Sequence, residues 1–398
     1  MIAVLIDRYC STDDLSTSDP YDIWKTRLGF RVKELFHRNK YLGLLPAAAL
    51  ASADKFLNNG WRVFYTRQEY PIVRAFACLS LLNLARQSGS ADCIAIAEKH
   101  LRWLLQNRCT GYHGYGWGLN FKHVVDRNIT YSPNTPFSTV TPYPLEAFVA
   151  FSELTGTTDW QEVISRIFDF FERDIQIMEQ GKDYLVTSYG PMHDRVVINA
   201  VSYTMYSYSL LMKFIPATER EYVWQKIRKL YRFLVESQRS DGSWWYSPEG
   251  RSFIDCFHSC IVLKNLIKTN RRRPLDSCDA VIAKGYEYLK AAFLDQKRYL
   301  FKRFSEQNRP SLIRFDLYDN AEMLNLAALM GDEETFRRLS RSILISFFDG
   351  DDIYSEIDLF GVKRNKSTLR WAVMPLVFAL SQRINRKENN HWLSGAVG

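Results

Sequence analysis

Asp255 and His258 stand three residues apart at the start of an apolar segment and carry the clearest chemical signal in this sequence. Residues at positions i and i+3 of a helix share one face, so the carboxylate and the imidazole would lie side by side. A carboxylate that orients an imidazole produces a group able to take or give a proton near neutral pH. The structural alternative is an aspartate that caps the helix next to a packed histidine.

A glycine-rich loop between residues 111 and 118 contains a second acid–base pair, His113 and Tyr115. Removal of a proton next to a carboxylate requires a base on one face of the carbon and an acid on the other, and histidine and tyrosine can fill both roles. The alternative is a lid, in which the tyrosine packs on the body of the protein.

Three further acidic residues, Asp316, Asp319 and Glu322, lie at the start of another apolar segment, and Asp319 and Glu322 share a helix face. Asp255 with Asp316 or Glu322 could supply the two carboxylates that an inverting glycosidase uses as acid and base. Buried ion pairs that hold the fold together explain the same cluster.

Three arginines, Arg74, Arg314 and Arg370, lie near the starts of such segments. We predict that they bind the substrate, because a guanidinium holds a carboxylate with two parallel hydrogen bonds. Pairing with neighbouring carboxylates is the structural alternative for each of them.

Other predicted substrate-binding residues are aromatic or polar side chains in loops and helix starts. An aromatic ring stacks on the C–H face of a pyranose, while nearby polar groups bond its hydroxyls. Helix capping by the asparagine and threonine, and packing of the tyrosines in the core, are the alternatives. Together with Asp319 and the three arginines, the predicted set is Trp117, Asn134, Thr135, Asn199, Tyr203, Tyr206, Trp244 and Tyr246.

Six segments of helical length, apolar nearly all round, would position these residues. Their starts lie near Pro71, Ser138, Val197, Phe253, Phe315 and Ser367, at intervals of 67, 59, 56, 62 and 52 residues. A helix that is apolar on most faces is buried. Amphipathic, charged segments at 93–107, 160–175, 219–237, 278–294 and 333–348 have the period of outer helices.

This alternation predicts an all-α protein, a single (α/α)6 toroid with six inner and about six outer helices. The repeat is longer than tetratricopeptide or HEAT units, and the strand signal is poor. We expect one domain over residues 1–398, with residues 1–40 as an N-terminal extension packed on it. The loops before the inner helices would then meet on one face. An open helical solenoid is the competing arrangement.

The segment from Phe233 to Trp244 resembles the QW motif of triterpene cyclases, in which a glutamine ties one helix end to the next helix start and a tryptophan stacks over it. Residues 103–107 with Trp117 resemble a degenerate second copy. The resemblance implies the toroid superfold. The cyclases' Asp-x-Asp-Asp-Thr signature is missing, and Asp349 to Asp352 only echoes it, which argues against terpene chemistry.

Five ordered motifs over roughly residues 70–330 resemble bacterial proteins found with capsule and exopolysaccharide biosynthesis. A more distant similarity links residues 131–136 to the helical domain of glucuronyl C5-epimerases, which also carry β-domains that this sequence does not show. The resemblance implies an anionic glycan substrate in surface polysaccharide assembly. The five motifs are residues 114–118, 133–136, 197–200, 238–244 and 253–259.

Composition limits the partners. The chain has 398 residues, 52 of them basic and 44 acidic, and the net charge of +8 favours anionic partners. The basic residues do not gather on one element, which argues against nucleic acid. The sequence shows no phosphate-binding loop, dinucleotide fingerprint or His-Glu-x-x-His, so we expect no nucleotide cofactor and no metal.

The compartment follows from weaker signals. Seven cysteines without paired spacing suit a reducing cytosol, and neither a signal peptide nor an apolar run of about 20 residues is present. We expect a cytoplasmic protein. Peripheral attachment to the inner membrane face and contact with membrane-associated polysaccharide assembly proteins are further options.

The function predicted from the sequence is a carbohydrate-active enzyme of surface polysaccharide biosynthesis. It would remove the proton at C5 of a uronate, as an epimerase or lyase, with His258 or Tyr115 as base and acid and Arg370 or Arg74 on the carboxylate. The alternatives are a glycoside hydrolase with paired carboxylates and a non-catalytic glycan-binding or scaffold subunit of a polysaccharide synthase complex.

Overall fold

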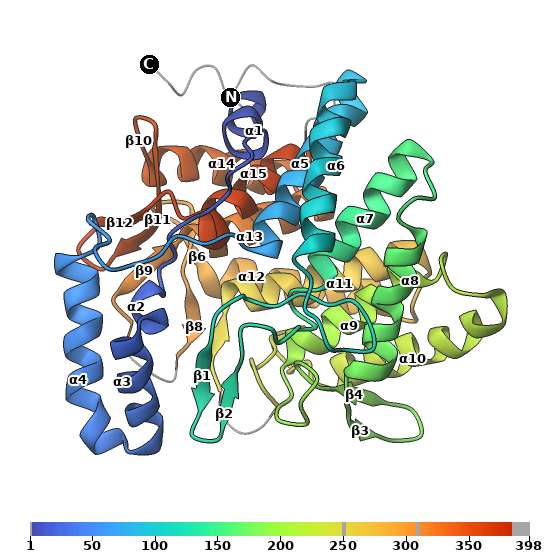
Figure 1. Ribbon diagram of the computed structural model, residues 1–398, viewed down its shortest axis with the longest axis horizontal. Helices are drawn as coiled ribbons and strands as arrows, with labels where there is room; N and C mark the ends of the chain where they lie inside the picture. The colour runs from blue at the N-terminus through green and yellow to red at the C-terminus, as the bar shows by residue number, and fades with distance from the viewer. Residues whose placement is uncertain (1, 249–251, 308–310, 384–398) are drawn as a thin grey trace.

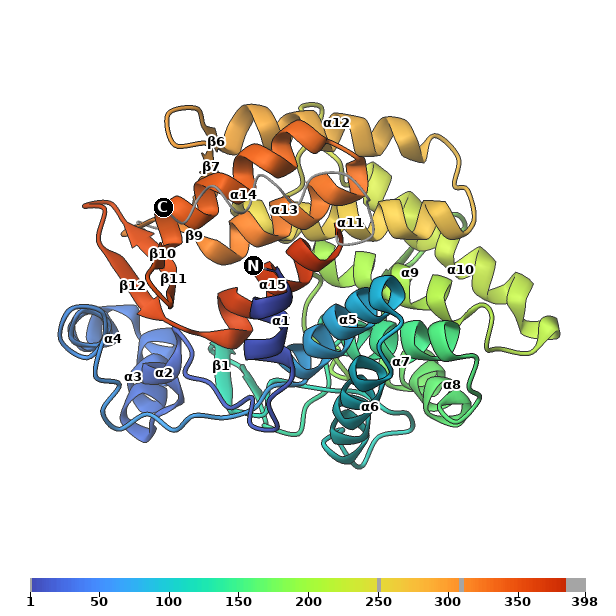
Figure 2. The ribbon, with the colours of Figure 1, turned by 90° about the horizontal axis from the view of Figure 1, so that it is seen from above.

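Six inner helices form a closed ring in the computed structural model, which describes residues 2–248, 252–307 and 311–383 (Figures 1 and 2). Each inner helix contacts the next, and the last contacts the first. The predicted toroid is therefore confirmed, and an open solenoid is excluded. The inner helices are α5 (Pro71–Ser88), α7 (Pro142–Thr155), α9 (Ile198–Leu211), α11 (Cys256–Arg272), α13 (Leu317–Met330) and α15 (Met374–Ser381), which follows the π-helical turn η3 (Leu369–Val373).

Five amphipathic helices cover the ring from outside, at the positions that the charged segments predict. A sixth outer position, against α5 and α15, is taken by α1 (Ile2–Cys10). The sequence assigned this stretch to an extension because nine residues are too short for a periodic signal. The five are α6 (Ala91–Gln106), α8 (Gln161–Asp169) with the π-helical turn η2 (Phe170–Asp174), α10 (Ala217–Glu236), α12 (Cys278–Phe293) and α14 (Glu333–Phe347).

Helix ends explain where several inner helices begin and stop. Proline occupies the first position of α5 and α7, where its missing N–H would have no partner in the helix. α5 and α13 stop at Gly89 and Gly331, whose φ angles of 68° and 74° suit a residue without a side chain.

The N-terminal part of the chain adds a helical hairpin beside the ring (Figure 1). The short helix α2 precedes it, and α3 and α4 pack against each other. The elements are α2 (Asp22–Lys25), α3 (Arg27–Arg38), α4 (Lys40–Ser52) and the π-helical turn η1 (Ala53–Leu57).

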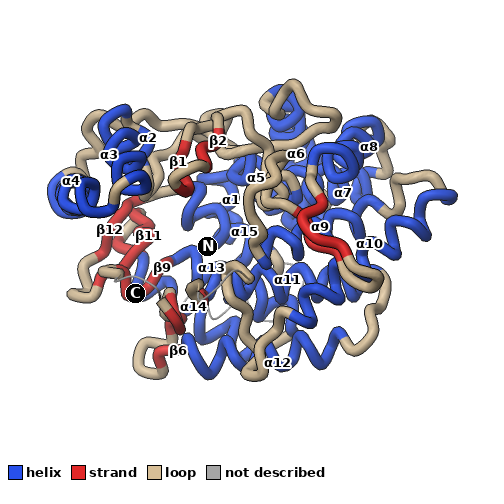
Figure 3. The backbone as a smooth tube through the Cα atoms, turned by 90° about the horizontal axis from the view of Figure 1, so that it is seen from below, coloured by secondary structure: helices blue, strands red, loops and turns tan. Residues whose placement is uncertain are grey.

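Short antiparallel strands occupy the connections between helices (Figure 3), and the sequence did not predict them because most have two to four residues. In the one four-stranded sheet, β11 pairs with β9, β10 and β12, and Glu356 lies opposite Asp316. The two-stranded pairs are β1 (His123–Asp126) with β2 (Ile129–Tyr131), β3 (Ile177–Gln180) with β4 (Leu185–Thr187), β5 (Ile254–Asp255) with β8 (Phe304–Glu306), and β6 (Leu294–Asp295) with β7 (Leu300–Phe301). The four-stranded sheet consists of β9 (Ile313–Asp316), β10 (Phe348–Asp349), β11 (Asp352–Asp358) and β12 (Lys363–Lys366).

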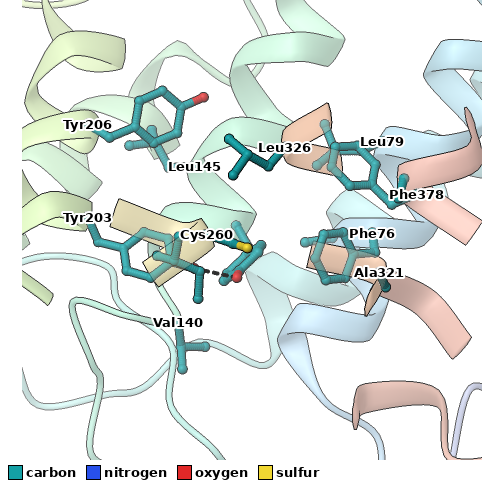
Figure 4. Close-up of a cluster of buried hydrophobic side chains, with 14 of the residues drawn as sticks. Phe76, Leu79, Val140, Leu145, Tyr203, Tyr206, Cys260, Ala321, Leu326 and Phe378 are labelled. Carbon is teal, nitrogen blue, oxygen red and sulfur yellow. Dashed lines mark hydrogen bonds between the residues drawn. The ribbon is translucent and has the colours of Figure 1, made fainter. Parts of the chain in front are cut away.

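Apolar side chains from all six inner helices fill the middle of the ring (Figure 4). Phe76 of α5 and Phe378 of α15 lie with ring centroids 5.1 Å apart, where the first and last inner helices meet. Close by in the same helix pair, Asn83 Nδ2 donates to Ser381 Oγ over 2.9 Å, and both residues are buried. These contacts close the ring between segments about 300 residues apart.

The glutamine–tryptophan motif acts as the sequence suggests. Gln238 Nε2 donates to the carbonyls of Gly242 (3.0 Å) and Val281 (3.1 Å), which ties the end of α10 to the first turn of α12. Trp244 Nε1 donates to the carbonyl of Leu234 at 2.8 Å. Trp117 Nε1 makes the same kind of bond to the carbonyl of Leu104 in α6, so the degenerate copy is a structural repeat.

None of the helices in the described part of the chain combines the length and apolar character that a bilayer crossing requires.

The closing contact gives a stability prediction. Phe378→Ala removes a buried ring between α5 and α15, and we expect it to lower the free energy of unfolding by about 3 to 5 kcal/mol. Urea denaturation followed by circular dichroism measures the loss. Phe360→Ala, at an exposed position, is the control and should change the free energy by less than about 0.5 kcal/mol. Equal effects of the two variants would contradict the assignment of Phe378 to ring closure.

Candidate active site

A cavity of about 370 Å³ lies at the end of the ring where the inner helices begin. All six inner elements contribute to its wall, with residues such as Ile72 in α5, Tyr143 in α7 and Tyr318 in α13. The amino ends of the six elements thus point the same way, and the partial positive charge of a helix start favours an anion there. Loops, the strands β1 and β8 and the N-terminal helices complete the wall with Tyr21, Trp24, Lys33, Leu119, Phe121, His123, Tyr189, Phe253, Arg303, Phe304 and Gln307.

Asp255 and His258 form the predicted pair in this wall. The two carboxylate oxygens lie 2.7 and 2.9 Å from His258 Nδ1. Asp255 is buried and His258 is mostly buried. Because the carboxylate accepts the Nδ1 hydrogen, Nε2 is the nitrogen left to exchange a proton with a molecule in the cavity.

Asp255 occupies the capping position of α11, yet its side chain makes no capping bond. The backbone N–H of Phe257, which a cap would bind, donates to Asp319 Oδ1 of the neighbouring α13 over 2.9 Å. At the matching position of α13, Asp316 does cap its own helix, accepting from the N–H of Tyr318 at 2.9 Å. Asp319 therefore supplies the missing cap and leaves the Asp255 carboxylate for His258.

Burial affects the protonation of Asp319. Its side chain has no contact with water, and this burial, together with the charge of Asp316, raises the pKa of its carboxyl well above the usual value. A protonated carboxyl still accepts the Phe257 N–H through its carbonyl oxygen. The capping bond therefore does not require a charged Asp319.

Aromatic rings surround the pair and supply flat walls. The ring centroids of Phe257 and Tyr246 lie 3.8 and 4.7 Å from that of His258. Trp371 packs on Tyr318 at 5.0 Å, and its indole nitrogen donates to Asp316 at 2.9 Å. Burial raises the pKa of Tyr246 to about 12, so its hydroxyl stays protonated at neutral pH. Such rings suit the C–H face of a pyranose.

Cations outnumber carboxylates in the wall. Arg303, Arg370 and Lys33 line the cavity, and among the lining residues that the structure describes Asp255 is the one carboxylate. Arg370 Nε donates to Asp19 at 2.5 Å. Burial alone would lower the pKa of Arg370, but Asp19 and nearby tyrosines outweigh it and raise the pKa, so the guanidinium stays charged. The lining is therefore mainly cationic, and the carboxylate partners of its two arginines, Asp19 and Asp316, lie outside it.

The structure brings together part of the predicted site. Asp255, His258, Asn199, Tyr203 and Arg370 all line the cavity. Asn199 is buried, and its Oδ1 has no hydrogen-bond partner, so it offers an acceptor to a ligand. Trp244 and Tyr246, also predicted, line a small recess directly behind His258.

The glycine-rich loop lies elsewhere, against the outer helix α8. His113 Nδ1 is 2.9 Å from Asp174 Oδ1, and the N–H of Gly114 donates to Asp174 Oδ2 at 2.9 Å. Tyr115 is sandwiched between Arg108 and Arg166, at 4.4 and 5.5 Å from their guanidinium carbons. The bonds to Asp174 hold the loop outside, so His113 and Tyr115 do not join His258 in the cavity.

Three more predicted residues in this region have structural contacts instead of places in the cavity wall. Trp117 is fully buried beneath the loop. Asn134 exchanges two hydrogen bonds with the backbone of Thr110, and Thr135 Oγ1 accepts from the N–H of Ser132 at 3.1 Å. These are loop and turn contacts, so helix capping, the alternative that the sequence left open for Asn134 and Thr135, does not describe them.

The remaining predicted residues lie behind or outside the cavity, most of them in ion pairs. Asp316 supports the wall from behind through Trp371 and Arg303. Tyr206 lies deeper in the ring, with Lys268 Nζ 5.0 Å from its ring centroid. The other ion pairs are Arg74 with Glu69, Arg314 with Asp295, and Glu322 with Lys264.

The sequence did not identify several residues of the wall. Trp371 directly follows Arg370, so a large aromatic side chain next to a predicted substrate-binding residue could have marked it. Arg303 lies between two short strands, and no periodic pattern places it next to Asp316. The hydroxyls of Tyr143 and Tyr203 share a hydrogen bond on the cavity floor, in which either one can be the donor. His123 lies in the strand β1, which the sequence did not predict.

Other parts of the described structure offer less chemistry. An open groove of about 1090 Å³ lies outside the ring beside α10 and the β3–β4 turn, away from every predicted residue. Within the described ranges, no three His, Cys, Asp or Glu side chains gather as metal ligands would.

No protein-family profile and no curated protein sequence matches this chain. Solved structures match its fold. A cellobiose 2-epimerase from Bacillus thermoamylovorans has a TM-score of 0.62 and 10% identity over 79% of this chain and 88% of its own. A sugar epimerase from a ruminal bacterium has a TM-score of 0.59 and 13% identity over 80% of this chain and 88% of its own. A GH76 α-mannanase from Bacteroides thetaiotaomicron has a TM-score of 0.57 and 11% identity over 92% of this chain and 97% of its own. At these identities the likeness establishes the shared toroid fold.

The partly buried His123 gives a pH prediction. Burial lowers its pKa from 6.5 to about 4, so the unfolded chain takes up a proton between those pH values while the folded protein does not. Stability should therefore fall as the pH falls from 6.5 towards 4, and His123→Phe, which suits the surrounding aromatic rings, should reduce this fall. Thermal midpoints measured from pH 8 to pH 4.5 provide the comparison.

Above pH 7 both states hold a neutral His123, so the stability difference between His123→Phe and the unmodified protein should not change with pH there. Parallel curves over the whole range would contradict the lowered pKa.

Proposed function

We propose that this protein is an enzyme that moves a proton at a carbon of an anionic sugar, with His258 as the proton-transferring group. The observation that carries the proposal is the His258–Asp255 pair in a cavity that also presents Arg303, Arg370 and Lys33. The fold shared with sugar epimerases supports a sugar as the substrate.

The reaction that fits best begins at C5 of a uronate residue. His258 Nε2 takes the C5 proton, and the bonding electron pair moves into the adjacent carboxylate, which becomes an enediolate. Cations near that carboxylate stabilise the added charge, and Arg303, Arg370 and Lys33 are placed to do so. Asp255 stabilises the imidazolium that forms.

Two outcomes follow from this intermediate. Return of a proton to the opposite face of C5 gives the epimer, whereas collapse of the electron pair towards C4 expels the substituent there and gives an unsaturated sugar. The hydroxyls of Tyr143 and Tyr203 lie together on the cavity floor, and burial raises the pKa of both well above 10. Each is therefore protonated at neutral pH and able to donate, the role that the sequence gave to Tyr115.

The same geometry favours proton transfer over glycoside hydrolysis. An inverting hydrolase needs two carboxylates that face the bond to be cleaved. Asp316 and Glu322, the partners that the sequence offered to Asp255, are buried in ion pairs and are absent from the described lining of the cavity. The motif resemblance to capsule and exopolysaccharide proteins supports a surface polysaccharide or its oligosaccharide precursor as the anionic substrate.

Solvent deuterium tests the reaction. In D₂O, the protein should introduce deuterium at C5 of a uronate-containing oligosaccharide, detected by NMR and mass spectrometry. His258→Gln and Asp255→Asn should each lower the rate by about 100-fold or more, because general acid–base catalysis contributes that much. His193→Gln, at an exposed loop position, is the control and should leave the rate unchanged.

New reducing ends without deuterium at C5 would instead identify a hydrolase. A scaffold subunit would show neither change, and cells with both substitutions at Asp255 and His258 would still make polymer. Either result would overturn the proposed proton transfer.

The cap provided by Asp319 gives a separate prediction. In Asp319→Ala the N–H of Phe257 loses its acceptor, so Asp255 should turn towards it and release His258. We expect kcat to fall roughly 10- to 100-fold with little change in KM, because the imidazole is displaced while the binding wall remains.

Asp319→Asn is the matched variant, since a carboxamide has the shape of a protonated carboxyl and its oxygen accepts the same bond. It should keep most of the activity. Equal losses in the two variants would contradict a positioning role through the Phe257 N–H.

A further inference from the structure

The helix α4 presents large apolar side chains to solvent. Tyr41 and Leu45 are 94% and 78% exposed, and Leu42 and Leu44 are exposed as well. Tyr41, Leu45 and Ala48 follow one another at helical spacing along one face, with Leu42 and Leu44 to either side. Contiguous apolar surface of this kind marks an interaction site in a protein that is otherwise well packed.

The loop that follows α4 continues this character. Trp61 is 84% exposed and Phe64 is 92% exposed, and Leu57 before them is exposed too. We call α4 and this loop, residues 40–64, the apolar arm. The arm departs from the rest of the chain, where large side chains of this type are mostly buried in the ring.

The arm has a defined structure, so its exposure is not the result of a loose end. Asn39 caps α4 by accepting from the N–H groups of Tyr41 and Leu42 at 3.0 and 3.2 Å. Gly43 lies so close to Phe36 of α3 that an added Cβ would stand 2.2 Å from the Phe36 Cα. The face of α4 that carries Gly43 is therefore held against α3, and the exposed apolar side chains lie on the other face. Figure 1 shows α4 on the outer side of α3.

Positive charge is concentrated in the same region. Residues 27–67 contain eight lysines and arginines but only two carboxylates, a net charge of +6 within a chain whose total is +8. Arg27, Arg31, Arg38 and Lys40 are exposed. Apolar side chains flanked by exposed cations are complementary to a surface with acidic headgroups above hydrocarbon.

We propose that the apolar arm docks on an anionic lipid bilayer, with α4 lying in the plane of the interface. Its 13 residues are too few to cross the hydrocarbon layer, and its tyrosine and the tryptophan of the loop are residue types that settle at the headgroup level. Lys33 of α3 lines the cavity, so the hairpin that carries the arm also borders the candidate active site. The docking does not rest on the proposed reaction.

Co-sedimentation of the full chain with vesicles tests the docking. Vesicles of phosphatidylglycerol and phosphatidylethanolamine should bind the protein, and vesicles of phosphatidylcholine should bind it far less. The double variant Leu42→Ser with Leu45→Ser should weaken binding about tenfold or more, because two exposed side chains no longer insert. Neither side chain belongs to the core, so folding should be unaffected.

Ile345→Ser provides the matched control. Ile345 lies on the outer helix α14 and is as exposed as Leu42, at 65%, but stands apart from the arm. The Ile345→Ser variant should bind vesicles like the unmodified protein. Arg31→Glu with Lys40→Glu should weaken binding to the anionic vesicles about tenfold, and raising the salt concentration should act in the same direction.

Three results would overturn the proposal. One is the absence of binding to anionic vesicles. Another is equal weakening by Ile345→Ser and by the double leucine variant. The third is a stable dimer in light scattering that the double leucine variant converts to a monomer, because the arm would then be the contact between two copies of this chain.

Discussion

The contact between α5 and α15 closes the ring of inner helices. It joins segments near residues 76 and 378 through packed phenylalanines and a buried hydrogen bond. Once the ring is closed, six helix starts face one space, and residues from six distant parts of the chain share a wall. In an open superhelix the same residues would be spread along an edge, and Arg370 could not share one cavity with Tyr143 and Asn199.

Within the closed ring, function and stability make opposed demands on one side chain. An aspartate at a helix start normally caps it, which stabilises the helix by about 1 kcal/mol. Asp255 instead holds His258, and Asp319 of the adjacent helix takes over the cap. Asp319 can cap α11 in place of Asp255 only because α11 and α13 are neighbours in the ring. Asp319 can serve there in either protonation state, because the bond needs an acceptor and not a charge.

Sequence alone was sufficient for features that depend on local spacing. The six apolar segments, the outer amphipathic helices and the i, i+3 relation of Asp255 and His258 are all of this kind. Sequence alone was insufficient where a contact between distant segments decides the position of a loop or a side chain. The glycine-rich loop has the composition of a binding loop, but Asp174 in η2 holds it against the outside. Arg303 and Trp371 reach the cavity through Asp316, and no spacing along the chain reveals that convergence.

In the proposed reaction the cavity holds an anionic sugar against His258. A crystal structure of the protein with a uronate-containing oligosaccharide tests it most directly. We expect the uronate carboxylate to lie among Arg303, Arg370 and Lys33, with C5 facing His258 Nε2 at roughly 3 to 3.5 Å. A sugar bound in the groove beside α10, or one whose carboxylate points away from the arginines, would contradict it.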